Sequence, residues 1–97
     1  MISSTARYPT AHASKYLQQL LKHFAHKVEV SFDETHGTAA LGSGPAELWA
    51  DAEGLTVRVT GEDAKAVIGA RYVIDSHLVN FAFREGFFGL TWTVDPA

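Results

Sequence analysis

The chain has 97 residues, a formal net charge of −3 and no cysteine. At this length we expect one domain with a single core and no room for a deep, enclosed catalytic chamber. The negative charge argues against a nucleic-acid-binding protein, which needs a basic surface, and the lack of cysteine excludes disulfides, thiolate zinc sites and a cysteine nucleophile. No apolar run approaches the ~20 residues that span a bilayer. Residues 1–5 show no secretion-signal pattern, so we expect a cytoplasmic protein without membrane partners.

The first elements predicted along the chain are a short strand and an amphipathic helix. Residues 2–8 alternate loosely in polarity and end at Pro9, which favours a strand. Thr10 is placed as the N-cap of the helix, because a side-chain oxygen there can accept a hydrogen bond from a free amide. From Ala13 to about Ala25 the apolar positions recur at helical spacing, at Tyr16, Leu17, Leu20, Leu21 and Phe24.

The middle of the chain, residues 28–59, predicts a four-strand meander. Polarity alternates over residues 28–32 and 55–59, and short strands are expected around residues 38–41 and 46–50. Glycine-containing turns separate these segments, which favours antiparallel hairpins. The loop Gly42-Ser43-Gly44-Pro45 lacks the lysine and the following helix of a phosphate-binding loop, so a plain hairpin turn is expected there.

A long helix and a last strand complete the predicted order. Thr60 is expected to cap the helix, with the acidic Asp63 three residues later. One apolar face then continues to Ala82, and Gly86 is expected to end the helix. Residues 88–94 alternate, which predicts a final strand. Five aromatic residues are assigned to the core: Phe81, Phe83, Phe87, Phe88 and Trp92.

The order β-α-ββββ-α-β predicts the fold class. An antiparallel sheet that is half buried needs its apolar face covered, and two amphipathic helices can cover it from one side. We therefore expect a single α+β domain over residues 1–97, built as a two-layer sandwich with a mostly antiparallel sheet and both helices on one face.

Polar groups along one edge of each helix are the best candidates for a functional site. In the first helix they form a stripe beside the apolar face, and in the second helix a similar stripe begins at His77. If the helices lie side by side, the two edges face each other across a groove. The candidate ligand-binding residues are His23, His26, Lys27, His77, Arg84 and Glu85.

Two chemistries are open for these residues. His23, His26 and His77 are candidate metal ligands, although no carboxylate is spaced to complete the set. Histidines at these places are also typical of a core edge and of a helix C-terminus, where positive charge is favoured. Arg84 is a candidate for holding a carboxylate or phosphate, or it pairs with a strand carboxylate while its stem covers aromatic rings.

Two strings resemble a bacterial family, the domain of unknown function family 2218, and the likeness covers nearly the whole chain. They are Lys22-His23-Phe24-Ala25-His26-Lys27 and His77-Leu78 followed by Phe81-Ala82-Phe83-Arg84-Glu85. The resemblance implies a small α+β fold similar to the carboxy-terminal domain of phosphohexomutases. The arginine-bearing phosphate loop of those domains has no match here, so their activity is not implied.

The resemblance also carries expectations about partners. Domains that look like this family are found joined to flavin-containing siderophore-interacting proteins, which implies an accessory role in iron handling. A small anionic ligand or a ferric siderophore is then an expected ligand, and a flavin reductase an expected partner. No cofactor is required by the sequence, although a metal fits the histidines.

Three functions follow as hypotheses. The leading one is a non-catalytic binding or accessory module that serves iron or siderophore metabolism. The second is a small metal-dependent enzyme that uses the helix-edge histidines. The third is a structural or dimerising domain, monomer or homodimer, that makes contact through the free sheet face or an edge strand. An exposed Trp49, opposite Leu48 on its strand, would favour interaction.

Overall fold

The computed structural model describes residues 1–96. Along the chain it has β1 Ile2–Pro9, α1 Ala13–Phe24, β2 Val30–Phe32, β3 His36–Leu41, β4 Gly44–Ala50, β5 Gly54–Gly61, α2 Ala64–Ala82, a 3-10 turn Phe83–Glu85 and β6 Trp92–Val94. This is the predicted β-α-ββββ-α-β order. The predicted α+β class is confirmed.

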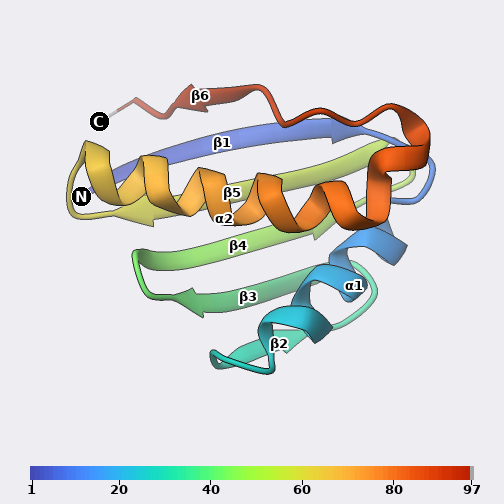
Figure 1. The fold of residues 1–97 in the computed structure, drawn as a ribbon, viewed down its shortest axis with the longest axis horizontal. Helices are drawn as coiled ribbons and strands as arrows, with labels where there is room; N and C mark the ends of the chain where they lie inside the picture. The colour runs from blue at the N-terminus through green and yellow to red at the C-terminus, as the bar shows by residue number, and fades with distance from the viewer. Residues whose placement is uncertain (97) are drawn as a thin grey trace.

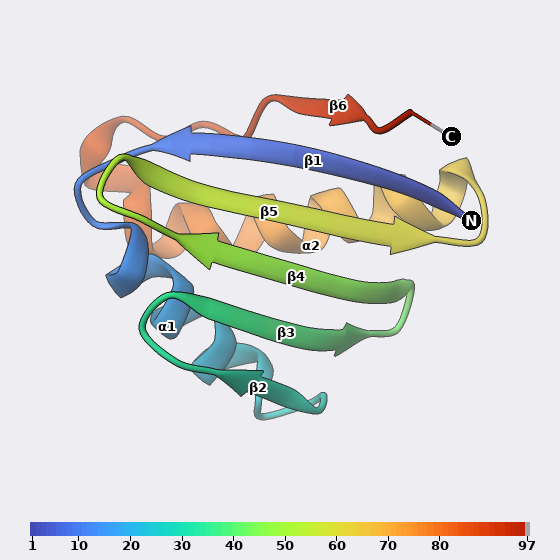
Figure 2. The same cartoon turned by 180° about the vertical axis from the view of Figure 1, so that it is seen from behind.

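The six strands form one antiparallel sheet in the order β2-β3-β4-β5-β1-β6. The four middle strands of the chain are the predicted meander, and β1 joins the meander at β5 and carries β6 on its other side. Both helices lie on one face of the sheet, α2 along β5 and α1 over β2 and β3 (Figure 1). Seen from behind, the strands are not covered by any helix (Figure 2). The two-layer arrangement is therefore as expected.

The core lies between the sheet and the helices. Strand residues of the covered face, such as Leu48, Leu55 and Val57, are fully buried, and so are Leu17 of α1 and Leu78 of α2. Burying one such side chain stabilises the fold by roughly 1.5–3 kcal/mol. The alternation read from the sequence is what places these residues on one face of each strand.

The uncovered sheet face is polar, and its charged side chains are paired. Arg7 Nη2 lies 3.0 Å from Asp51 Oδ1, and Arg58 Nε lies 3.2 Å from Asp95 Oδ2. Trp49, which is 37% exposed, packs on the His36 ring with centroids 5.7 Å apart. Because these charged side chains already pair with each other, the exposed part of Trp49 alone does not make this face an interaction surface.

Both predicted helix caps are wrong. Thr10 lies before the turn that leads into α1, and its Oγ1 accepts a hydrogen bond from the His12 N–H and donates to Glu85, while α1 begins at Ala13. Thr60 belongs to β5 and hydrogen-bonds Ser3 across the sheet. Asp63 caps α2 instead, accepting from the Ala66 N–H at 2.8 Å. In both places the threonine hydroxyl forms a hydrogen bond with a side chain of another element, Glu85 or Ser3.

The last predicted strand is shorter than expected. Gly86 ends the helical segment in the left-handed region at φ +79°, as predicted, but only Trp92–Val94 pairs with β1. Gly89 at φ +149° interrupts the extended run, and Phe88 is 99% exposed. The assignment of Phe88 to the core is therefore wrong, and so is that of Phe83, which is 58% exposed.

Within the described chain, neither helix combines the length and the apolar character needed to cross a bilayer.

Candidate functional site

A pocket lies where the C-terminal end of α1 meets α2 and the β3–β4 hairpin. Because α1 ends at Phe24, it stops short of the turn between β3 and β4 and leaves that end of the covered sheet face open. The pocket encloses about 590 Å³, within the range of about 300–1,000 Å³ that is usual for small-molecule sites. We call it the helix-edge pocket. Its lining residues are His23, Phe24, His26, Lys27, Val28, Leu41, Gly42, Ser43, Gly69, Val73 and His77.

The end of α1 supplies the basic rim of the pocket. After Phe24 the chain turns tightly, with the Lys27 and Val28 N–H groups both donating to the Phe24 carbonyl at 2.9 Å. This turn leaves His23, His26 and Lys27 exposed at the mouth while Phe24 stays buried. Positive side chains are favoured at this end of a helix, because the free carbonyls there carry partial negative charge. None of the described residues that line the pocket is acidic.

The wall formed by α2 is made of Gly69, Val73 and His77, which recur at helical spacing along one side of the helix. A Cβ added at Gly69 would meet no atom within 4 Å. Glycine in a helix interior costs about 0.5–1 kcal/mol relative to alanine. Glycine at position 69 is therefore less stabilising than alanine would be, and it leaves space open at the pocket.

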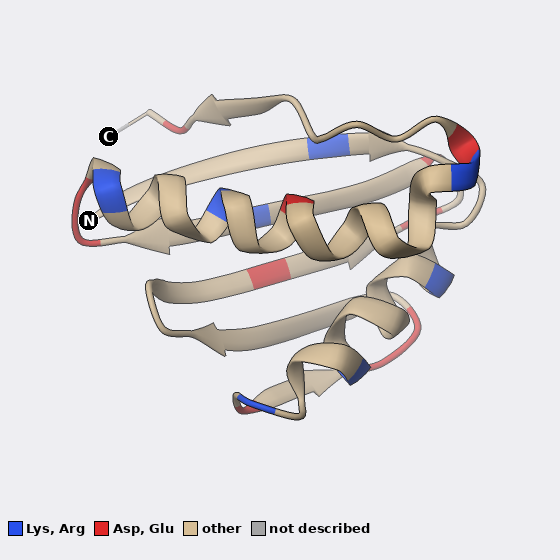
Figure 3. Cartoon of the chain, in the orientation of Figure 1, with Lys and Arg blue, Asp and Glu red and all other residues tan. Residues whose placement is uncertain are grey.

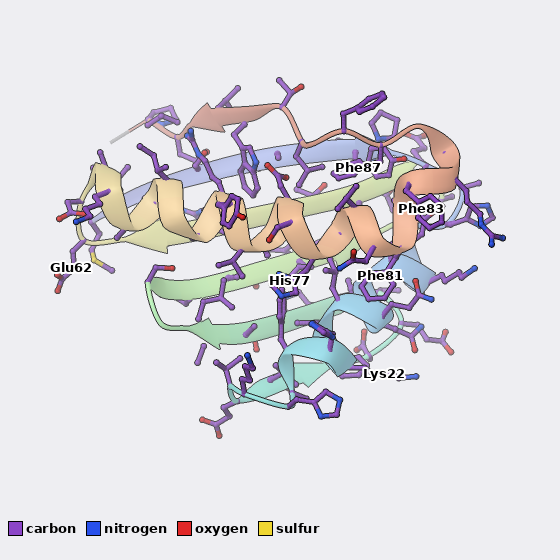
Figure 4. The ribbon with its side chains drawn as sticks, viewed as in Figure 1. Lys22, Glu62, His77, Phe81, Phe83 and Phe87 are labelled. Atoms are coloured by element: carbon purple, nitrogen blue, oxygen red, sulfur yellow. The ribbon has the colours of Figure 1, made fainter. Side chains whose placement is uncertain are left out.

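His77 is held in a defined orientation. Its Nδ1 lies 2.6 Å from the Val73 carbonyl oxygen, so Nδ1 carries the proton and donates. The ring packs edge-on to Phe24 with centroids 5.2 Å apart and lies 4.9 Å from the His23 ring. His77 and Phe81 both project from α2 toward α1 (Figure 4). The helix edges therefore face each other here, as the sequence suggested.

The three candidate metal ligands do not form a metal site as they are placed. His26 lies further out than His77, with its ring centroid 6.5 Å from that of His23. Among residues 1–96, no three His, Cys, Asp or Glu side chains are gathered so that they could hold a metal ion.

Arg84 and Glu85 lie outside the pocket, at the far end of α2. Arg84 is exposed, with its guanidinium carbon 5.7 Å from the Phe83 ring centroid. It makes no ion pair with a strand carboxylate within the described residues. The predicted ligand-binding set is thus divided: four residues line the pocket, and these two do not.

Glu85 has a structural role instead. Its carboxylate accepts hydrogen bonds from the hydroxyls of Tyr16 at 2.6 Å, Thr10 at 2.9 Å and Tyr8 at 3.0 Å. These bonds, the one from Tyr16 above all, lower the pKa of Glu85. Burial, and then the hydrogen bond to Glu85, raise the pKa of Tyr16. The cluster ties the turn after α2 to both β1 and α1.

Sequence reasoning missed the apolar part of the pocket. Val28 and Leu41 lie in predicted strands, Val73 and Gly69 lie in the predicted long helix, and none of the four was predicted as a site residue. An unexplained glycine in the middle of a long helix was the one available signal.

The comparisons with known proteins agree with this fold. The model of a protein family described as "Uncharacterized protein conserved in bacteria (DUF2218)" matches residues 5–93.

The chain belongs to this family.

A solved structure is similar to this chain over its whole length. The chain is 27% identical to the Pseudomonas aeruginosa protein PA4090, whose structure was determined by NMR; the likeness covers 100% of this chain and 98% of that one, with a TM-score of 0.77. No curated protein matches the chain. The resemblance to family 2218 that the two sequence strings suggested is therefore confirmed.

The two strings of that resemblance have different places in the structure. The first, residues 22–27, contributes four residues to the pocket, including His23, His26 and Lys27. The second contributes His77 to the pocket and Glu85 to the hydroxyl cluster. A family-level pattern therefore contains both pocket-lining and fold-stabilising residues of this chain.

Proposed function

We propose that this member of the DUF2218 family is a non-catalytic binding module whose helix-edge pocket holds a small ligand with an apolar body and an acidic group. The observation that carries this proposal is a pocket with an apolar floor, containing Phe24, Val28 and Leu41, below a rim of His23, His26 and Lys27. Such a combination of apolar lining and few polar groups is typical of ligand sites.

The charge of the rim favours an anion. The C-terminal end of α1 contributes the equivalent of about −0.5 charge, which opposes an anionic group. Lys27 contributes a full positive charge at the mouth of the pocket. Since none of the lining residues within 1–96 is acidic, the net charge at the mouth is positive.

A role in iron or siderophore handling is the more specific form of this proposal. A ferric siderophore with an acidic, apolar periphery belongs to the same chemical class, and a flavin reductase would be its expected partner. The metal-dependent enzyme is less favoured, because the three histidines do not converge in residues 1–96.

Filling the pocket is expected to abolish binding. In Gly69→Leu the new side chain occupies space that is open in the wild type, and replacing a helix-interior glycine should also raise stability by about 0.5–1 kcal/mol. The probe is anilinonaphthalene sulfonate, an apolar anion, followed by fluorescence titration and competed with an aromatic carboxylate and a ferric hydroxamate. We expect the affinity of this variant to fall at least ~10-fold, a cost of about 1.4 kcal/mol.

Unchanged probe binding by folded Gly69→Leu would place the binding elsewhere and reject the pocket as the site. If neither competitor displaces the probe from the wild type, while Gly69→Leu still weakens probe binding, those two ligands are rejected. An apolar anion then remains the expected class of ligand.

The positive rim is tested by a matched pair of substitutions. Lys27→Met keeps the apolar stem and removes the charge, whereas Lys22→Met makes the same change on an exposed α1 residue outside the pocket. We expect the first to weaken probe binding by about two- to fivefold, since exposed ion pairs contribute roughly 0.2–1 kcal/mol, and the second to leave it unchanged. Equal effects of both would show that only the net charge of the protein matters.

A further inference from the structure

The outward side of α2 is apolar where a surface helix is normally polar. Ile68 is 60% exposed, Tyr72 72% and Phe83 58%, and Val79 between them is partly buried. These four residues recur at helical spacing on the side opposite the core, and we call them the α2 stripe. In contrast, the exposed residues of α1 include polar ones such as Lys15 and Lys22.

The spacing of the α2 stripe is self-complementary. Ile68 and Phe83 share a midpoint with Tyr72 and Val79, and it falls between Asp75 and Ser76. Two α2 helices packed antiparallel about a two-fold axis at this midpoint place Ile68 against Phe83 of the other copy and Tyr72 against Val79. Isologous contacts of this kind are the commonest in homo-oligomers.

The helix dipoles and the middle of α2 fit the same arrangement. Both signs of charge occur at each end of α2 (Figure 3), and antiparallel pairing brings opposite helix-dipole ends together. The two charged side chains in the middle of α2 turn away. Arg71 donates to Ser4 Oγ, and Asp75 accepts from the Leu90 N–H and the Trp92 Nε1–H.

The area is enough for a weak dimer. A Tyr or Phe side chain buries about 150–250 Å², so Tyr72 and Phe83 each offer roughly 100–180 Å² of exposed surface. Adding Ile68, Val79 and the stems of Lys65 and Arg84 brings the total for two copies to about 1,000 Å², near the lower limit for specific interfaces. We therefore expect the dimer to be weak, so that monomer and dimer coexist at accessible protein concentrations.

The alternative contacts are weaker candidates. The edge strands β2 and β6 have three residues each, too few for a long strand-to-strand contact. The uncovered sheet face carries paired charges, as described above.

We propose that the protein forms a symmetric homodimer through the α2 stripe, with the two α2 helices antiparallel. The pocket residues of α2 face α1 and not the stripe, so the dimer and the ligand site are tested independently.

Sedimentation equilibrium of the wild type over ~1–300 µM is expected to show a monomer–dimer equilibrium. Tyr72→Glu places a charge at the stripe and should be monomeric throughout, whereas Lys22→Glu, a charge change on α1, should dimerise like the wild type. Circular dichroism confirms that both variants are folded. A wild type that stays monomeric over the whole range overturns the proposal, and so does dimerisation of Tyr72→Glu at the wild-type strength.

Single cysteines test the register, because the natural chain has none. Ser76→Cys lies beside the two-fold axis and should form a disulfide-linked dimer under mild oxidation. Ile68→Cys lies roughly 22 Å from its own counterpart in antiparallel pairing, beyond the reach of a disulfide. Cross-linking of Ile68→Cys but not of Ser76→Cys would indicate parallel helices and contradict the arrangement. Equal cross-linking of both, or of neither, would contradict it too.

Discussion

Replacing Glu85 by alanine is expected to lower the free energy of unfolding by about 3 kcal/mol, because three hydroxyl groups lose a charged acceptor. Tyr16 is nearly fully buried, so its hydroxyl is left without a partner and contributes much of the loss. In a domain of this size the melting temperature should fall by about 15 °C. Urea unfolding and thermal melting at neutral pH measure both quantities.

Single-hydroxyl variants provide the graded control. Tyr16→Phe and Tyr8→Phe each remove one donor and leave the carboxylate two, so each should cost about 1 kcal/mol, with Tyr16→Phe the larger because its bond is shorter. If Glu85→Ala cost no more than Tyr8→Phe, the cluster would not be a stabilising unit.

The same cluster makes stability depend on pH. The folded pKa of Glu85 lies below its ordinary value of 4.5, chiefly because the Tyr16 hydroxyl donates to the carboxylate. The stabilisation is therefore complete above pH ~4.5 and is lost as the pH falls through the lower, folded value. Glu85→Gln removes this contribution at every pH. The stability difference between wild type and variant should shrink from neutral pH toward pH ~3, and a constant difference would contradict the assignment.

Much of the fold could be predicted from local patterns. Alternation in the meander placed Leu48 and Val57 on the covered face, and the helical repeat from Tyr16 to Phe24 placed α1. These patterns suffice because one face of each element is buried and one is not. The helix starts were wrong because a threonine oxygen bonds whichever amide or hydroxyl the fold brings near, as Thr10 and Thr60 show.

The site was predicted only in part, for a related reason. His23, His26, Lys27 and His77 lie around one pocket because the helical stripes of α1 and α2 do meet. Arg84 and Glu85 continue the sequence pattern, but they lie in the 3-10 turn that follows α2, beyond the part of the helix that lines the pocket. The floor depends on Leu41 and Val28, whose distance from α2 is set by tertiary packing and has no local signature.

The hairpin that closes the pocket offers the other large expected effect. Gly44 adopts φ +141°, and a Cβ built there would overlap the backbone carbonyl oxygen of Thr60 on the neighbouring strand. Backbone atoms of a central strand cannot move aside as a flexible side chain can. We therefore expect Gly44→Ala to lower the free energy of unfolding by about 3 kcal/mol, from conformational strain together with the clash.

Gly42, two residues earlier in the same turn, is the matched control for that measurement. A Cβ at Gly42 meets no atom within 4 Å, and its φ is not positive, so Gly42→Ala should change stability by less than ~0.5 kcal/mol. Because Gly42 lines the pocket, this variant also shows whether a methyl group at the mouth alters probe affinity without altering the fold. If Gly44→Ala and Gly42→Ala changed the stability equally, Gly44 would not pack closely on the Thr60 backbone in solution. A large difference would show that close packing of Gly44 on Thr60 holds this wall of the pocket in place.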